Sequence, residues 1–209
     1  MKKLFTAIQK NDIETIKALL DESPELIACT FKGTPKKFDG QSPLQVALKT
    51  SDTKTIELLL AYDPDVNFIE DESCLNSWRA PVIHDAINRA IMFSRWNVNR
   101  PEGIEVFNSN NAADEAFAIL KELIIMGADV NAKDSYGNAC MNRACMQARQ
   151  ILPVIGRNDR ILTPELRFDI SRIFKLLKAS GADMNYIAPN AFGKTYKEQY
   201  GDEVIGEFI

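Results

Sequence analysis

The chain has 209 residues, of which 45% are hydrophobic and 26% charged, which is ordinary for a soluble folded protein of one large or two small domains. Its formal net charge of −4 gives no electrostatic signal for nucleic-acid binding. No stretch approaches the roughly 18 apolar residues that a membrane span needs, so we expect neither a nucleic acid nor a membrane as a partner.

Two short amphipathic helices are predicted at the start of the chain. Leu4, Ala7 and Ile8 recur at helical spacing. A second apolar stripe follows within a few residues, formed by Ile13, Ile16, Leu19 and Leu20. This first unit ends in residues 24–27.

The clearest unit of the sequence runs over residues 37–67. Gly40 readily supplies the positive φ of a turn. Ser42 can cap a helix, and Pro43 fits its first turn, where a missing N–H costs nothing. Pro64 ends the unit, because it cannot continue a helix. Between them lie two apolar stripes at helical spacing, Leu44, Ala47 and Leu48 and then Ile56, Leu59 and Leu60.

The same order of turn, helix, turn and helix returns further along the chain. A third unit opens near Pro81 and a fourth near Asp134. A stub from Asn190 has a mostly polar helix, which is typical of a terminal repeat that needs a polar outer face. Units two to four close on one phrase, Asp65-Val66-Asn67, Asp129-Val130-Asn131 and Asp183-Met184-Asn185.

These units resemble the ankyrin-repeat family. Residues 42–47, Ser-Pro-Leu-Gln-Val-Ala, look like the family signature Thr-Pro-Leu-His-x-Ala, and residues 127–131 match its closing Gly-Ala-Asp-Val-Asn. The resemblance implies an all-α fold, an α-solenoid of helix-turn-helix units with β-hairpin or loop connections, in one domain over residues 1–209. The expected repeats span about 1–29, 37–69, 78–131 and 134–185, with a truncated cap at 190–209.

The intervals between closing phrases exceed the family period of about 33 residues, so extra material is expected at about 70–79, 95–111 and 150–163. Insertions at one internal position of neighbouring repeats map to one face of a stack. Two interpretations of their apolar residues stay open, a binding patch with an aromatic anchor or a local mini-core. The residues concerned are Trp96, Phe107, Leu152 and Ile155.

The residues that usually carry catalysis are sparse. His84 is the only histidine, which removes most catalytic triads and metal sites that need histidine, and the resemblance implies that it binds backbone between repeats. The four cysteines contain no Cys-x-x-Cys pair, so we expect free thiols in a reducing compartment, with the cytoplasm as the default. Carboxylate pairs lie in loops and at helix starts. We expect no enzyme activity, metal or cofactor.

What remains is recognition by a surface. The resemblance implies a groove lined by hairpin tips and first helices, binding a protein partner of unknown identity to a monomeric chain. The alternative is an inhibitor or immunity-type protein that masks a partner's active site with the insertions of repeats three and four. The groove candidates are Lys37, Phe38, Asp39, Lys49, Thr50, Arg89, Ser135, Tyr136, Asn138 and Gln147. Phe38 and Tyr136 are the aromatic candidates among them.

Overall fold

The structure is a computed structural model that describes residues 1–154, 156 and 159–209. It is mostly helical, which confirms the expected helical class at that level. The described helices are α1 (Lys2–Lys10), α2 (Ile13–Glu22), α3 (Pro43–Thr50), α4 (Thr53–Leu60), α5 (Val82–Met92), α6 (Asn110–Ile125), α7 (Cys140–Ala148), α8 (Pro164–Ala179) and α9 (Tyr196–Tyr200). Short 3-10 helices lie at Pro24–Ala28, Lys36–Phe38 and Val204–Phe208.

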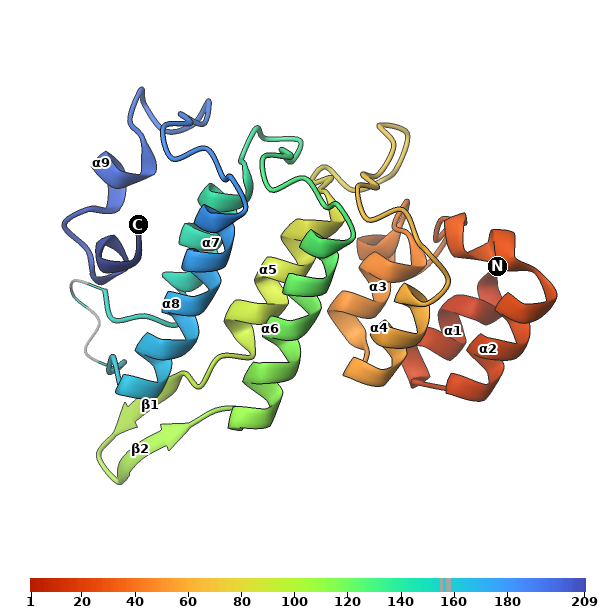
Figure 1. Cartoon of the computed structure of the whole chain (residues 1–209), viewed down its shortest axis with the longest axis horizontal. Coiled ribbons are helices and arrows are strands. Elements are labelled where there is room, and N and C mark those ends of the chain that lie inside the picture. Colours follow the sequence, from red (N-terminus) through yellow and green to blue (C-terminus); the bar gives the residue numbers. More distant parts are fainter. Residues whose placement is uncertain (155, 157–158) are drawn as a thin grey trace.

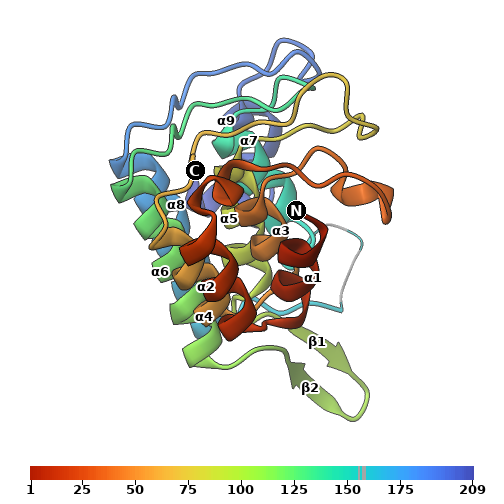
Figure 2. The same ribbon diagram turned by 90° about the vertical axis from the view of Figure 1, so that its right-hand side faces the viewer.

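The first eight helices form two rows (Figure 1). Helices α1, α3, α5 and α7 contact one another in order and make the inner row, while α2, α4, α6 and α8 make the outer row. Each inner helix also packs against the outer helix that follows it in the chain. The loops that join successive pairs lie together at one end of the helices, and those before α3 and α5 reach past the inner row (Figure 2).

Side chains before each helix explain where several helices begin. The Ser42 hydroxyl accepts from the amide of Gln45, and the Gln45 side chain accepts from the amide of Ser42, which completes a capping box before α3. Thr163 caps α8 in the same way through the amide of Leu166, with a proline at the first helical position. The start at Ser42 and Pro43 was predicted from the sequence and is confirmed.

The closing phrases connect one loop to the next through asparagine side chains. The Asn67 side chain accepts from the amide of Asp129 at 2.8 Å and donates to the carbonyl of Gly127 at 2.9 Å. Asn131 repeats both bonds with Asp183 at 2.7 Å and Gly181 at 2.9 Å. Because each asparagine binds only backbone of the next phrase, successive loops keep one register.

The two described strands lie where the sequence predicted only an insertion. Strands β1 (Asn97–Arg100) and β2 (Gly103–Val106) pair antiparallel, with Arg100 opposite Gly103, and form a hairpin that projects beyond α6 (Figure 1). By contrast, the hairpin expected before α3 contains no strand in the described part of the chain. In its loop the amide of Phe31 donates to the carbonyl of Gln41 at 2.7 Å, and the carbonyl of Phe31 accepts from the amide of Gly40 at 2.9 Å.

No helix in the described part of the chain combines the length and the apolar character that crossing a membrane requires. The longest, α6 and α8, have 16 residues each. Buried apolar residues form one core that continues from α1 through α8, including Leu4, Leu44, Leu59, Ile87 and Phe174.

Candidate functional site

A pocket opens between two loops and the inner row. It has a volume of about 340 Å³ and lies between the loop before α3, the end of α3 and the loop before α5. We name it the Phe38–Trp78 pocket after the aromatic residues of its two loops. Its lining residues are Lys37, Phe38, Gln41, Lys49, Thr50, Asn76, Ser77 and Trp78.

The two loops of this pocket are fixed to each other by hydrogen bonds. The Asn76 side chain donates to the carbonyl of Lys37 at 2.9 Å, and the amide of Leu75 donates to Asp39 Oδ2 at 2.9 Å. Gly40 allows the close approach, because a Cβ on it would lie 2.5 Å from the Cβ of Cys74, and its φ of +82° favours glycine. The pocket walls therefore do not depend on a ligand to hold them together.

Trp78 ties the same pocket to the next loop. Its indole nitrogen donates to Asp134 Oδ2 at 2.9 Å. The Ser135 hydroxyl donates to the carbonyl of Ser77 at 2.9 Å and accepts from the amide of Arg79 at 3.1 Å. Burial alone would raise the pKa of Asp134, but hydrogen bonds from Trp78, from Asn138 and from nearby amides hold that pKa below its ordinary value. An ionised Asp134 thus anchors the indole.

Two cations lie over the Trp78 ring. Lys49 Nζ is 5.8 Å from the ring centroid, and the Arg143 guanidinium is 4.8 Å from it. Lys49 also lies 2.9 Å from Asp85 Oδ2. Arg143 donates to the neutral side chains of Asn88 at 2.7 Å and Gln147 at 3.1 Å. The surface beside the pocket is therefore cationic and aromatic at once.

Asp85 lies beneath this surface. Burial raises its pKa to about 6, and the charge of Lys49 opposes that rise. Its side chain is 1% exposed and is covered by Lys49, so a ligand on the surface meets the ammonium and not the carboxylate. A general acid must reach the atom that it protonates. Asp85 is consequently placed to position Lys49.

The groove candidates chosen from the sequence divide into accessible and buried residues. Lys37, Thr50 and Ser135 are exposed, and Tyr136 is 53% exposed at the tip of its loop. The Lys49 side chain is partly exposed and lines the pocket. Asp39 accepts a hydrogen bond from the amide of Leu75 in the next loop. The accessible candidates come from the loop side of the inner row, as expected.

Four candidates are buried, contrary to the expectation. Phe38 packs edge-on against Phe31, with ring centroids 5.9 Å apart, so only the rim of its ring can face the pocket. Arg89 donates to the carbonyl of Leu48 at 3.2 Å and lies over the Phe93 ring. Asn138 binds Asp134, and Gln147 binds Arg143. Arg89 thus joins α5 to α3, while Asn138 and Gln147 are held within their own loop and helix.

Trp78, Asn76 and Ser77 line the pocket but were absent from the sequence-based candidates. They lie at the end of the enlargement at 70–79, for which the sequence indicated only inserted residues and no site. Trp78 is one of only two tryptophans in the chain, and a tryptophan beside a predicted hairpin was the available signal.

The insertion candidates fold against each other. The rings of Trp96 and Phe107 stack with centroids 4.2 Å apart, and the Arg160 guanidinium lies 5.1 Å from Trp96. Asn97 exchanges two hydrogen bonds with the backbone of Ile161, at 2.8 and 3.0 Å. These contacts favour a mini-core over an open patch. Leu152 is buried within the main core, and Ile155 lies outside the described residues.

A charged pair secures the start of this mini-core. Asp169 on α8 accepts from Arg95 at three positions, the amide, Nε and Nη2, each at 2.9 Å. The Asp169 side chain is 1% exposed, and Arg172 lies 3.3 Å away. Such a multiply bonded pair fixes where the insertion leaves α5.

His84 lies at the start of α5 with no exposed surface. Its Nε2 donates to the carbonyl of Ala132, 3.2 Å away in the next loop, which assigns the tautomer with hydrogen on Nε2. Burial lowers its pKa to about 4, so the ring is neutral near pH 7. These contacts match the structural role implied by the resemblance.

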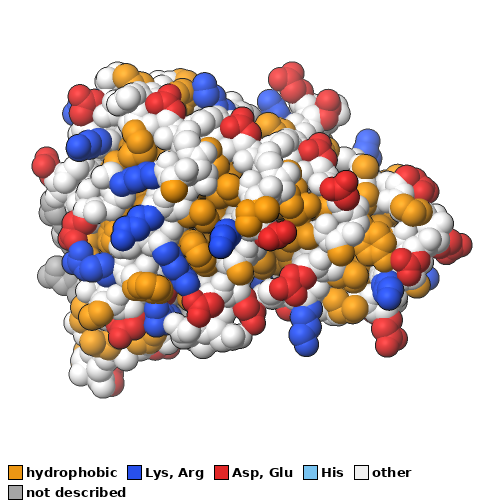
Figure 3. All heavy atoms as spheres, in the orientation of Figure 1, with side chains coloured by type: hydrophobic (Ala, Val, Ile, Leu, Met, Phe, Trp, Pro, Cys, Tyr) orange, Lys and Arg blue, Asp and Glu red, His pale blue; other side chains and the backbone are white. Residues whose placement is uncertain are grey.

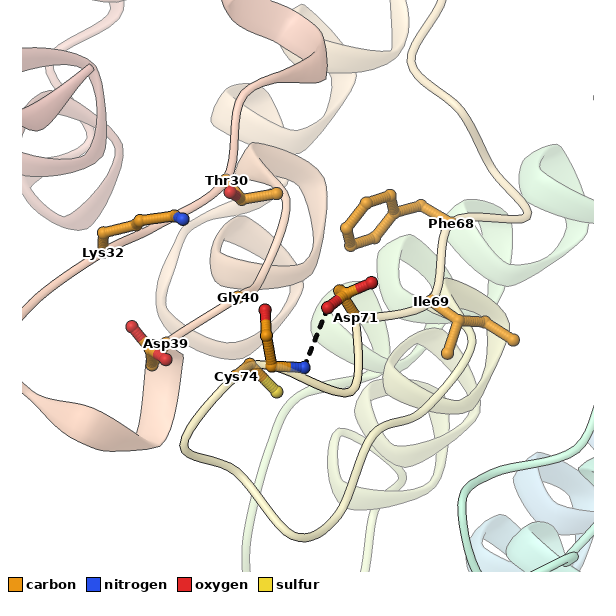
Figure 4. A pocket seen from close by; sticks show the side chains of 9 residues that line it. Thr30, Lys32, Asp39, Gly40, Phe68, Ile69, Asp71 and Cys74 are labelled. Carbon is orange, nitrogen blue, oxygen red and sulfur yellow. Dashed lines mark hydrogen bonds between the residues drawn. The ribbon is translucent and has the colours of Figure 1, made fainter.

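A second cavity lies on the far side of Gly40 and also measures about 340 Å³ (Figure 4). Lys32, Asp39 and Asp71 supply its charges, and the amide of Cys74 donates to the carbonyl of Asp71 at 3.1 Å. The Cys74 thiol lies 3.5 Å from the carbonyl of Asn76. This space separates two packed loops, and its carboxylates come from different loops.

The outer row presents a different surface. Lys and Arg side chains gather over α8 on this face (Figure 3). Several are paired within the chain, since Arg172 binds Asp114 and Asp169 and Arg167 binds Glu207. This face therefore carries exposed charge that is in part paired within the chain.

The described part of the chain contains no cluster of three or more His, Cys, Asp or Glu residues arranged to hold a metal ion. Among the sites described above, the Phe38–Trp78 pocket combines a cavity with two cations over an aromatic ring. In comparisons with known proteins, no protein-family model and no curated protein matches the chain.

Proposed function

We propose that the chain is a stack of four ankyrin-like repeats with a truncated fifth, and that it is a non-catalytic protein-interaction module. Its groove is the loop side of the inner row, from Lys37 to Tyr136. The proposal is supported by the in-order contacts of the helix pairs and by the identical asparagine bonds between closing phrases. In such a stack each unit packs only on its neighbours, which holds groups on successive loops at fixed spacing.

The observation that carries the function is the pre-formed Phe38–Trp78 pocket. Hydrogen bonds between loops hold its walls, so binding there loses little conformational entropy. Exposed Lys37 and Tyr136 lie on the same side of the inner row and offer one flexible cation and one rigid aromatic ring. Together they favour recognition of another protein over chemistry on a small substrate.

The test uses two double variants, each of which replaces one exposed lysine and one exposed large side chain with alanine. Lys37→Ala with Tyr136→Ala alters the groove, while Lys121→Ala with Ile125→Ala removes an exposed lysine and a 66% exposed apolar residue from α6 on the outer row. Proteins captured from the native host are identified by mass spectrometry. We expect a partner that the groove variant loses and the α6 variant keeps. Capture of every partner by the groove variant at wild-type level would contradict the proposal.

One observation favours the second function, an inhibitor that acts through its insertions. Ile104 is 50% exposed and Val106 is 55% exposed on the projecting hairpin, and both lie on β2. If a captured partner is an enzyme, its turnover is measured with the whole chain and with a variant whose residues 98–105 are replaced by an Asn-Gly turn. Inhibition that needs the hairpin supports this function, whereas unchanged inhibition rejects it.

A further inference from the structure

The charge of the Phe38–Trp78 pocket differs in sign from that of the whole chain. The chain carries a formal net charge of −4, yet the described residues that line the pocket include two lysines and no acid. Arg143 adds a third cation over the Trp78 ring. A local positive field on a negative protein attracts a negative partner to that one place.

These cations are only partly neutralised by the chain. Lys37 forms no ion pair within the described residues. Arg143 donates to two neutral amides, Asn88 and Gln147, and the charges of Asp85 and Asp134 also act on it. Lys49 has an acid partner in Asp85, but that carboxylate is buried beneath it. The pocket therefore presents the ammonium groups of Lys37 and Lys49, and the Arg143 guanidinium lies beside it over the Trp78 ring.

From this arrangement we propose that the Phe38–Trp78 pocket binds an extended acidic segment of a protein partner. Its carboxylates pair with Lys37 and Lys49 in the pocket and with Arg143 beside it, and an apolar side chain lies against the rims of Phe38 and Trp78. This inference rests on the proposed function of the groove. A nucleic acid is disfavoured, because a chain of net charge −4 with three local cations lacks the extended basic surface that phosphates require.

The segment can be found with a phage library of random dodecapeptides that is panned on the whole folded chain. We expect the selected peptides to be enriched in Asp and Glu beside an apolar residue. Synthetic copies with a fluorescent label are then titrated by polarisation. Affinity should fall as NaCl is raised, because the contacts are between exposed charges.

Two neighbouring lysines supply a matched pair of charge reversals. Lys37 and Lys36 are both exposed in one 3-10 turn, but only Lys37 lines the pocket. Lys37→Glu should weaken binding of the selected peptide about tenfold or more, as expected from losing a charge-assisted contact and adding repulsion. Lys36→Glu should change it less than about threefold, because it lies outside the pocket.

A second variant keeps the net charge constant. Lys49→Gln with Asp85→Asn removes both members of the ion pair, so a change in overall charge cannot explain a loss of binding. We expect weaker binding with a melting temperature close to that of the wild type. The proposal is overturned if acidic peptides bind to Lys37→Glu and to this double variant as tightly as they bind to the wild type.

The remaining outcomes separate the inference from the function beneath it. Selected peptides that are not acidic, but are lost with Lys37→Ala and Tyr136→Ala, overturn the acidic segment and leave the groove function standing. If none of the selected peptides depends on the groove for binding, both the acidic segment and the groove function are overturned. Single-stranded DNA of twelve nucleotides that binds more tightly than the peptides, and is lost with Lys37→Glu, replaces the acidic peptide with a nucleic acid.

Discussion

The loop side and the insertion side lie at opposite ends of the same helices and use tryptophan in opposite ways (Figure 1). On the loop side, Trp78 lines an open pocket with two cations over its ring. On the insertion side, Trp96 is stacked on Phe107 and covered by Arg160. One ring is the wall of an open pocket, and the other is part of a small core.

The polar groups of the two sides follow the same division. Arg95 and Asn97 on the insertion side bind other parts of the chain, with partners on α8 and in the loop before it. On the loop side, Lys37 and Tyr136 remain exposed, while Asn76, Trp78 and Ser135 hold neighbouring loops together. The extra length at 95–111 is therefore mostly used for stability, whereas the enlargement at 70–79 contributes to the proposed recognition surface on the loop side.

The largest effect is expected from Arg95→Ala on the insertion side. The substitution removes two side-chain bonds from buried Asp169 and leaves Arg172, 3.3 Å away, as its remaining charged partner among the described residues, which should cost about 3 kcal/mol or more of unfolding free energy. Urea unfolding measures the change. The control is Arg100→Ala, whose exposed pair with Glu105 should matter by less than about 1 kcal/mol. Equal effects of the two substitutions would mean that the insertion is not secured at Arg95.

The next effect concerns pH and the loop side. The pKa of His84 is lowered from 6.5 to about 4, so its contribution to stability is complete above pH 6.5 and is lost as the pH falls towards 4. The full loss amounts to about 3 kcal/mol. Asp85 acts oppositely, because its pKa is raised from 3.8 to about 6 and its contribution is lost as the pH rises through that range.

Because the two groups oppose each other, the histidine is best observed directly. His84 is the only histidine, so its imidazole carbon signal in an NMR titration is unambiguous. We expect a midpoint below pH 5. A midpoint near 6.5 would show that the ring is solvated and that the loop before α7 is not held to α5 as described.

A smaller effect measures the mini-core itself. In a double-mutant cycle of Trp96→Ala and Phe107→Ala, the coupling energy isolates the stacked pair from the loss of buried area. Rings in this geometry should give about 1 kcal/mol. A coupling indistinguishable from zero in chemical denaturation would favour an insertion that is open enough to bind a partner.

The smallest expected effect is that of Tyr136→Ala. The ring is 53% exposed, and its hydroxyl makes only a long bond to Ser77 at 3.4 Å. The unfolding free energy should change by less than about 0.5 kcal/mol, as for most surface substitutions. A loss of more than about 1 kcal/mol in a thermal melt would move Tyr136 from the recognition surface to the packing of the loops.

The sequence predicted the features that depend on local chemistry. The helix start at Pro43 follows from the hydroxyl residue before it, and it lies where it was expected. The strands of the insertion were missed, because four-residue strands with little burial leave almost no periodicity to read.

Accessibility at the loop tips was harder to predict. Phe38 is buried because Phe31 meets it from the other limb of its loop, and Phe5 of α1 meets Phe31 in turn. Trp78 was missed for the complementary reason, since its importance comes from Lys49, Asp134 and Arg143, which are distant in the sequence. Contacts between successive units determine the accessibility of Phe38 and the surroundings of Trp78. The spacing of residues within one unit does not predict those contacts.

The asparagine bonds between closing phrases have a consequence for how such a chain can diverge. Asn67 and Asn131 each grip the backbone of the following phrase and none of its side chains. A joint of this kind does not depend on how many residues separate it from the next one. Lineages of this chain are therefore free to gain or lose segments between joints, and we expect length differences to collect at the insertion side while the spacing of the loops stays constant.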